Sequence, residues 1–104
     1  MELTVKQKQY LKGLAHSLEP VVMISDKGGL SDAVIKEVDK SLNAHELIKV
    51  RVLSDSREFR LNLIDELCNK TGSSLVQHIG KLLVLYRVGD KAKIVLPNLG
   101  KLER

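Results

Sequence analysis

The sequence predicts an α/β fold in which helices cover a mixed four-stranded sheet, with the element order α-β-α-β-α-β-β. Three segments repeat apolar residues at helical spacing, and the second and third of them lie between short apolar runs of strand length. Strand–helix–strand units of this kind form right-handed crossovers. The last two apolar runs are separated only by Gly80 and Lys81, which is typical of a β-hairpin.

The first helix is expected over residues 5–18, with Thr4 as its N-terminal cap. Lys8 and Lys12 share one face of this helix. The run "VVMI" at residues 21–24 is apolar and rich in β-branched residues, so it predicts a buried strand. The apolar residues that recur at helical spacing in the first helix are Tyr10, Leu11, Leu14 and Leu18.

Two more helices are expected further along the chain. Ser31 can cap one at about residues 32–44, and Gly72 can end another at about residues 57–70. The inward residues are expected to be Ala33, Val34, Val38 and Leu42 in the first of these, and Phe59, Leu63, Leu67 and Cys68 in the second.

The segment "LIKVRVL", residues 47–53, alternates in polarity and is expected to be a strand. Lys49 and Arg51 should face one side of it, and Ile48, Val50 and Val52 the other. The runs "LVQHI" and "LLVLYR" should pair as the hairpin, with glycine at the first position of a type II′ turn. A weakly ordered extension with an added strand at 93–96 is expected after the hairpin.

At 104 residues, the chain is expected to form one domain over residues 1–97, followed by a C-terminal tail at 98–104. Its apolar runs are shorter than the roughly 18 residues that suggest a membrane span. The N-terminus lacks the apolar stretch of a signal peptide. Cys68 is the single cysteine, which excludes an internal disulfide and makes a reducing cytoplasm the expected location.

Reactive side chains do not converge in the sequence, so no enzymatic activity, cofactor or metal site is expected. His16, His45 and His78 are scattered, and no cysteine pair accompanies them. We expect His45 and Glu46 to have a local capping or packing role at the end of a helix. Cys68 lies in an amphipathic pattern and is expected to be a packing residue rather than a nucleophile.

The formal charge of +4, with a pI of about 9.3, is compatible with a polyanionic partner. The positive excess lies outside the second helix, where residues 31–46 carry two lysines against four carboxylates. Residues 47–53 and 80–104 carry most of it. The chain has only three aromatic residues, so any RNA binding should depend on phosphates and shape rather than on stacked bases.

The stretch "SDKGGLSDAV", residues 25–34, leads from a strand into a helix and allows two interpretations. Gly28 and Gly29 can expose backbone N–H groups at a helix N-terminus, where an anion is favoured, with Lys27 adding a positive charge. Alternatively, the glycines only permit a positive φ in a tight turn.

Basic side chains on the sheet allow two interpretations as well. They can contact phosphates, or they can serve to keep sheet edges from aggregating. The candidates on the sheet are Lys49, Arg51, Lys81 and Arg87.

Four motifs, taken together, resemble the CRM domain (chloroplast RNA splicing and ribosome maturation) in its small stand-alone bacterial YhbY-type form. In chain order they are "KQKQYLKGLAHSLEPVVMI", "GGLSDAV", "HELIKV" and "IGKLLVLYR", and they cover roughly residues 3–90. The resemblance implies an α/β sandwich similar to the C-terminal domain of bacterial translation initiation factor 3. It also implies RNA binding and association with precursors of the large ribosomal subunit.

The resemblance aligns the stretch at 25–34 with the family's GxxG loop. Lys27, Gly29 and Leu30 match that pattern, whereas Asp26 stands where the first glycine is expected. A carboxylate there would repel phosphate unless it points away or pairs with Lys27. The RNA-binding residues that follow from the sequence and the resemblance together are Lys27, Gly28, Gly29, Lys8, Lys12, Lys49, Arg51, Lys81 and Arg87.

The expected function is therefore that of a non-enzymatic RNA-binding protein acting in assembly of the large ribosomal subunit, through electrostatic capture of structured rRNA. The alternative is an adaptor that binds a ribosomal protein or an assembly GTPase through an apolar sheet surface. A continuous basic face would favour RNA, and an exposed apolar patch would favour the adaptor.

Overall fold

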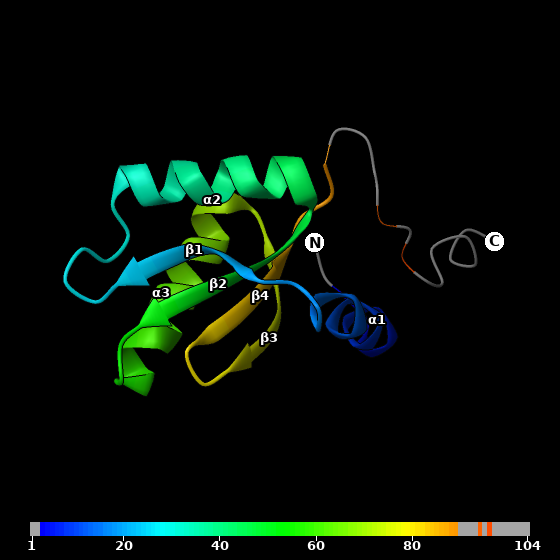
Figure 1. The fold of residues 1–104 in the computed structure, drawn as a ribbon, viewed down its shortest axis with the longest axis horizontal. Helices are drawn as coiled ribbons and strands as arrows, with labels where there is room; N and C mark the ends of the chain where they lie inside the picture. The colour runs from blue at the N-terminus through cyan, green and yellow to red at the C-terminus, as the bar shows by residue number, and fades with distance from the viewer. Residues whose placement is uncertain (1–2, 90–93, 95, 97–104) are drawn as a thin grey trace.

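The computed structural model describes residues 3–89 together with Ile94 and Leu96. The order of its elements is the predicted one (Figure 1). They are α1 (Val5–Ala15), β1 (Pro20–Ser25), α2 (Asp32–His45), β2 (Leu47–Leu53), α3 (Arg57–Thr71), β3 (Ser74–Ile79) and β4 (Leu82–Tyr86). In this described part of the chain, every helix is too short or too polar to cross a membrane.

The four strands form one mixed sheet with the order β1-β2-β4-β3, which confirms the predicted sheet. β1 and β2 run parallel and are joined through α2. β4 is antiparallel to both β2 and β3. The crossover through α3 therefore places β3 two positions from β2, and the hairpin returns β4 into the gap between them.

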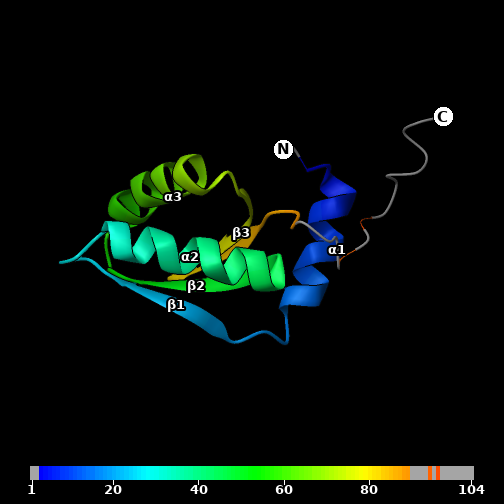
Figure 2. The ribbon, with the colours of Figure 1, turned by 90° about the horizontal axis from the view of Figure 1, so that it is seen from above.

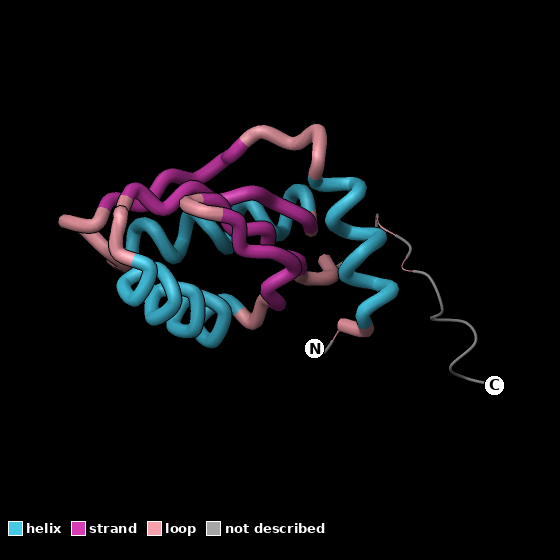
Figure 3. Tube along the Cα trace, turned by 90° about the horizontal axis from the view of Figure 1, so that it is seen from below, coloured by secondary structure: helices cyan, strands magenta, loops and turns pink. Residues whose placement is uncertain are grey.

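The two faces of the sheet are covered unequally. α2 and α3 lie side by side over one face, and α1 crosses one end of the other face (Figure 2). Seen from below, most of that second face carries no helix among the described residues (Figure 3). We call it the open face.

A large core fills the space beneath α2 and α3. Its buried residues are Val22, Ile24, Val38, Leu42, Ile48, Val50, Val52, Leu63, Ile64, Leu67, Leu83 and Leu85. A smaller core lies beneath α1, and its buried residues are Leu11, Ala15, Leu47, Val76, Val84, Tyr86 and Leu96. β2 and β4 contribute to both cores because successive strand residues point to opposite faces.

The predicted caps are confirmed. The Thr4 hydroxyl accepts the Gln7 N–H at 3.1 Å, and the Gln7 side chain accepts the Thr4 N–H at 3.0 Å, so α1 begins with a capping box. Ser31 accepts the Val34 N–H at the start of α2. Gly72 ends α3 with a φ of +67°, the left-handed conformation that favours glycine.

The predicted apolar stripe of α1 is wrong in part. Tyr10 and Leu14 are exposed, whereas Gln7, Leu11 and Ala15 are the buried residues of the helix. α1 crosses only one end of the sheet, so a narrow row at i, i+4 spacing is enough to cover the contact. The helix also ends at Ala15, three residues before the expected end.

β1 is an edge strand rather than a fully buried one. Val22 and Ile24 point into the large core, while Val21 and Met23 are exposed on the open face. The continuous apolar run predicted burial on both sides, but α1 does not extend far enough to cover the outer side of this strand.

The hairpin turn has the predicted form. Gly80 has a φ of +56°, and Lys81 is not among the residues with positive φ, which is the type II′ pattern. The expected strand at 93–96 and the tail at 98–104 lie outside the described residues, apart from Ile94 and Leu96.

Glu46 has the local structural role predicted for it. It follows α2 with a φ of +67°, and its side chain is only 1% exposed. Its carboxylate accepts the N–H of Gly89 at 2.6 Å and that of Ile94 at 2.9 Å. Glu46 thus holds the backbone that follows β4 against the end of α2.

Candidate nucleic-acid interface

α1 presents a basic row beside the sheet. Lys8, Lys12 and His16 follow one another at i, i+4 spacing, and Lys12 and His16 are exposed. The buried Leu11 and Ala15 hold this part of the helix against the smaller core. His16 is not among the RNA-binding residues expected from the sequence, although its i, i+4 spacing from Lys12 already places it on the same helix face.

Lys49 and Arg51 lie on the open face, as the alternation in β2 predicted. Their neighbours Ile48 and Val50 are at most 1% exposed beneath α2 and α3. In the sheet register, Lys49 lies opposite Val84. Arg51 lies opposite Leu82 on one side and Met23 on the other. The two cations therefore project between apolar side chains.

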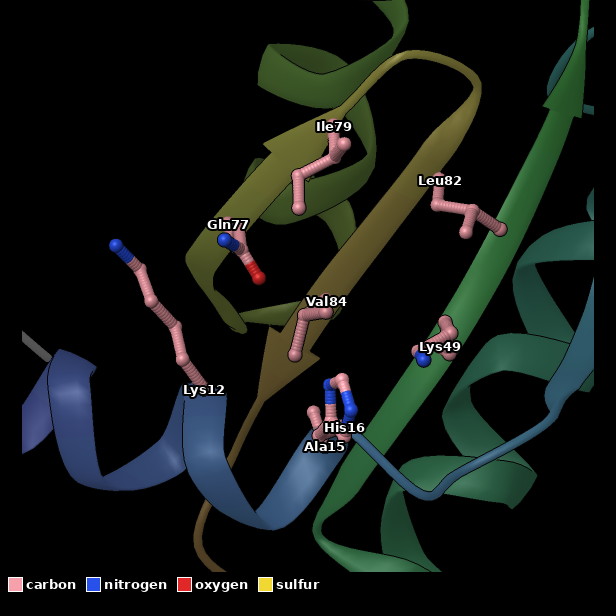
Figure 4. Close-up of a pocket in the computed structure, with 8 residues that line it drawn as sticks. All are labelled: Lys12, Ala15, His16, Lys49, Gln77, Ile79, Leu82 and Val84. Atoms are coloured by element: carbon pink, nitrogen blue, oxygen red, sulfur yellow. The ribbon is translucent and has the colours of Figure 1, made fainter.

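A cavity of about 100 Å³ lies between the end of α1 and the open face (Figure 4). Lys12 and Lys49, predicted separately from a helix and a strand, both line it. The full lining is Lys12, Ala15, His16, Lys49, Gln77, Ile79, Leu82 and Val84. Within the described residues this lining includes no carboxylate, so the cavity suits a ligand with negative charge.

A β-bulge brings Gln77 and Ile79 to this cavity. The pairing of β3 with β4 shifts between Leu75 and Gln77, because two residues of β3 oppose one of β4. Leu75 packs against the large core, so regular alternation would turn Gln77 and Ile79 toward that core as well. With the bulge they line the cavity on the open face instead. The sequence did not predict the bulge, so Gln77 and Ile79 are not among the expected site residues.

The turn after β1 is held together by Ser25. The Ser25 hydroxyl accepts the N–H groups of Lys27 and Gly28, both at 3.1 Å, and its carbonyl accepts the Gly29 N–H at 2.9 Å. Gly29 has a φ of +56°. The backbone donors that were expected to face an anion are thus used inside the turn. The Lys27 side chain is the group through which this loop can attract one.

The loop at residues 25–29 lies far from the basic row on α1, which consists of Lys8, Lys12 and His16 and is called the α1 row below. It projects at the opposite end of the sheet from α1 in two views (Figures 1 and 2). The predicted residues therefore form separate basic regions rather than a single cluster. That Lys27, Gly28 and Gly29 contact RNA stays a prediction.

Lys81 stands at the hairpin turn and is partly neutralised. Its ammonium group lies 2.9 Å from the Asp55 carboxylate, which is almost fully exposed. The hydrogen bond from Lys81, followed by its positive charge, lowers the pKa of Asp55. The Lys81 carbonyl accepts the Val52 N–H, which holds the turn beside β2.

Arg87 has a structural role. Its guanidinium donates to the Asp39 carboxylate at 2.7 Å, to the Thr71 carbonyl at 2.6 Å and to the Asn43 side chain at 2.9 Å. A fourth hydrogen bond reaches the Asp39 carbonyl. These bonds join the end of β4 to α2 and α3, away from the open face. We therefore leave Arg87 out of the interface.

Cys68 packs against the large core and is half-buried. Burial raises the pKa of its thiol, which lowers the fraction of the side chain present as reactive thiolate. Among the described residues, no group of three His, Cys, Asp or Glu side chains is placed to hold a metal ion.

The open face also exposes apolar side chains. Met23 is 62% exposed and Ile79 is 59% exposed, while Val21 and Leu53 are exposed to a smaller extent, 44% and 42%. The register places Met23, Arg51, Leu82 and Ile79 in one row across the four strands. The surface is therefore mixed, with cations set among aliphatic side chains.

Known proteins resemble this chain over nearly its whole length. An RNA-binding protein of Haemophilus influenzae is 50% identical over 96 residues, which cover 92% of this chain and 96% of that protein. A probable RNA-binding protein of Bacillus subtilis is 42% identical over 91% of this chain and 99% of its own length.

The fold has a solved counterpart as well. The solution structure of a hypothetical protein from Staphylococcus aureus superposes with a TM-score of 0.80 at 42% identity, covering 92% of this chain and all of that one. The model of the CRS1/YhbY (CRM) domain matches residues 3–87, which include every helix and strand described above. On this evidence, the chain belongs to the CRS1/YhbY (CRM) domain family.

Proposed function

We propose that this protein binds RNA through the α1 row and the cations of the open face. The observation that carries the proposal is the convergence of Lys12, His16 and Lys49 on one cavity whose described lining has no carboxylate. The names of the relatives from Haemophilus influenzae and Bacillus subtilis support the same activity. Family membership supports it as well.

The mechanism is electrostatic capture of a phosphate backbone. Lys8, Lys12, Lys49 and Arg51 form the main contact surface, and Lys27 adds a separate contact at the far end of the sheet. Each neutralised phosphate releases counterions, so the affinity falls as the salt concentration rises. Neutralising about four to six phosphates gives a slope of log affinity against log salt between roughly −3 and −5.

The proposed target is rRNA of precursor large ribosomal subunits, bound during their assembly in the cytoplasm without catalysis. The motif resemblance to the CRM family supports this target. The lone cysteine supports the location.

A binding titration tests the RNA proposal. Lys49→Met and Arg51→Met together remove two charges from the open face while keeping much of the aliphatic length. Lys36→Met and Lys40→Met remove two charges from exposed positions of α2, on the other side of the sheet. We expect the first pair to weaken binding to an rRNA fragment and to reduce the salt slope by about 2, since each phosphate contact contributes about 0.9. Equal losses in the two pairs would show that only net charge matters.

Sedimentation tests the proposed target. A tagged copy of the chain should migrate with precursor large subunits on a sucrose gradient, and crosslinking in cells should recover their rRNA. Co-migration only with mature ribosomes, or crosslinks dominated by other RNAs, would contradict the assembly proposal and leave RNA binding intact.

The second candidate function is that of an adaptor for a ribosomal protein or an assembly GTPase. The exposure of Met23 and Ile79 favours it. Met23→Ser with Ile79→Ser would abolish capture of such a partner from nuclease-treated extract if the adaptor function is correct. If the partner is lost on nuclease treatment alone, RNA mediates the association.

A further inference from the structure

We propose that the cavity between α1 and the open face holds one unpaired nucleotide of the bound RNA. This inference rests on the proposed RNA binding and adds the part of the RNA that the cavity takes.

The size of the cavity points to part of a larger ligand. Its volume of about 100 Å³ lies well below the roughly 300–1,000 Å³ of pockets that enclose whole small molecules. A single base projecting from a strand needs only a shallow recess, because the rest of the nucleotide stays outside. A free cofactor would be left mostly uncovered here.

The lining divides into an apolar floor and a charged rim. Val84 is buried and lies at the centre of the cavity, with Ile79 and Leu82 toward one end (Figure 4). Flat bases can be held between apolar as well as aromatic side chains. The aliphatic floor therefore suits an unstacked base in a protein with few aromatic residues.

The rim supplies charge from two sides. Lys12 extends from α1 on one side of the cavity, and Lys49 rises from β2 on the other (Figure 4). His16 lies between the helix and β2, beside Lys49. Two cations placed in this way can contact the phosphates that precede and follow an inserted nucleotide.

Gln77 supplies the hydrogen-bonding group on the wall. Its amide offers a donor and an acceptor together, which is the pairing that base edges present. A bulge turns this side chain toward the cavity, and bulges often re-aim side chains next to functional sites. A phosphate alone would need neither the amide nor the apolar floor. The combination therefore favours a nucleotide whose base is unpaired and out of the stack.

Two RNAs test the inference. One is a perfectly paired hairpin stem, and the other is the same stem with a single unpaired nucleotide inserted in one strand. Binding of both is measured for the parent, for Gln77→Leu and for the control Gln9→Leu, which changes an exposed glutamine of α1 outside the cavity lining.

We expect the parent to prefer the RNA with the unpaired nucleotide, and Gln77→Leu to lower that affinity about fivefold, the effect of one lost hydrogen bond. Affinity for the paired stem and the salt slope should not change, and Gln9→Leu should resemble the parent. If Gln77→Leu binds both RNAs as the parent does, or loses both equally, the inference is overturned. If the parent binds neither RNA, the proposed function fails instead.

A second measurement, photocrosslinking, uses the parent protein and therefore does not require that any variant fold. A photoreactive 4-thiouridine at the unpaired position should crosslink the parent within Ile79–Val84 or at the end of α1, at Ala15 or His16. Crosslinks confined to the turn at 25–29 or to α2 would overturn the inference even if binding prefers the unpaired nucleotide.

Discussion

The two faces of the sheet differ in what they contribute. The face beneath α2 and α3 is closed, and its strand residues are nearly all withdrawn from solvent. Among the described residues, helix α1 covers the open face at one end only and leaves Met23, Arg51 and Ile79 exposed. Because β2 and β4 supply residues to both faces, one strand can stabilise the fold with alternate residues and contact a ligand with the others. Substitutions should therefore separate stability from binding according to the face they alter.

The largest expected contrast is between a core leucine and an exposed methionine. Leu67→Ala, at a fully buried position of α3, should lower the free energy of unfolding by about 3 kcal/mol through lost burial and a cavity. Met23→Ala on the open face should change it by less than about 0.5 kcal/mol. Urea denaturation of the two variants measures this. A similar loss in both would mean that Met23 is packed in solution.

The next largest effect is expected at Arg87, whose guanidinium is held by α2 and α3 rather than exposed on the open face. Arg87→Met should lower the free energy of unfolding by about 2 kcal/mol, because it leaves the Asp39 carboxylate and the Thr71 carbonyl without their guanidinium partner. Affinity for RNA, measured on the folded variant, should fall less than it does in Lys49→Met. A loss of binding as large as that of Lys49→Met would return Arg87 to the interface.

Cys68→Ala should have a smaller effect, about 1 kcal/mol, since the side chain is small and only half-buried beside the large core. Thermal or urea unfolding measures the change, and RNA binding should stay the same. The raised pKa of the thiol predicts slow labelling of the native protein at neutral pH. Rapid labelling, at the rate of the unfolded chain, would contradict a packing role.

The smallest expected effect is at the turn after β1. Lys27→Ala should weaken RNA binding by about 0.5 kcal/mol, the scale of an exposed charge contact, because only the side chain is available there. Asp26→Gly should leave binding unchanged or strengthen it, since it removes a repulsive carboxylate. Circular dichroism serves as the folding control. If Lys27→Ala binds as the parent does, or Asp26→Gly binds clearly worse, the stretch is only a turn.

The elements and their caps could be read directly from the residues. The helices are capped at the predicted residues, namely Thr4, Ser31 and Gly72. Strand β2 has the predicted bounds and the predicted alternation of buried and exposed residues. These features depend on interactions between residues a few positions apart. The candidate site was less predictable. Lys12 and Lys49 were named, but nothing local indicated that they line the same cavity.

By itself, the sequence determined the order of the elements, the α/β class, the hairpin turn and the family motifs, because spacing, capping and turn chemistry act over short stretches of chain. Only the tertiary structure decided which strand faces stay open. It also decided that a bulge sends Gln77 to the open face, and that Arg87 is held by α2 and α3. The physical reason is that coverage and hydrogen-bond partners depend on residues distant in sequence. The identity of a side chain does not determine which of these distant residues it contacts.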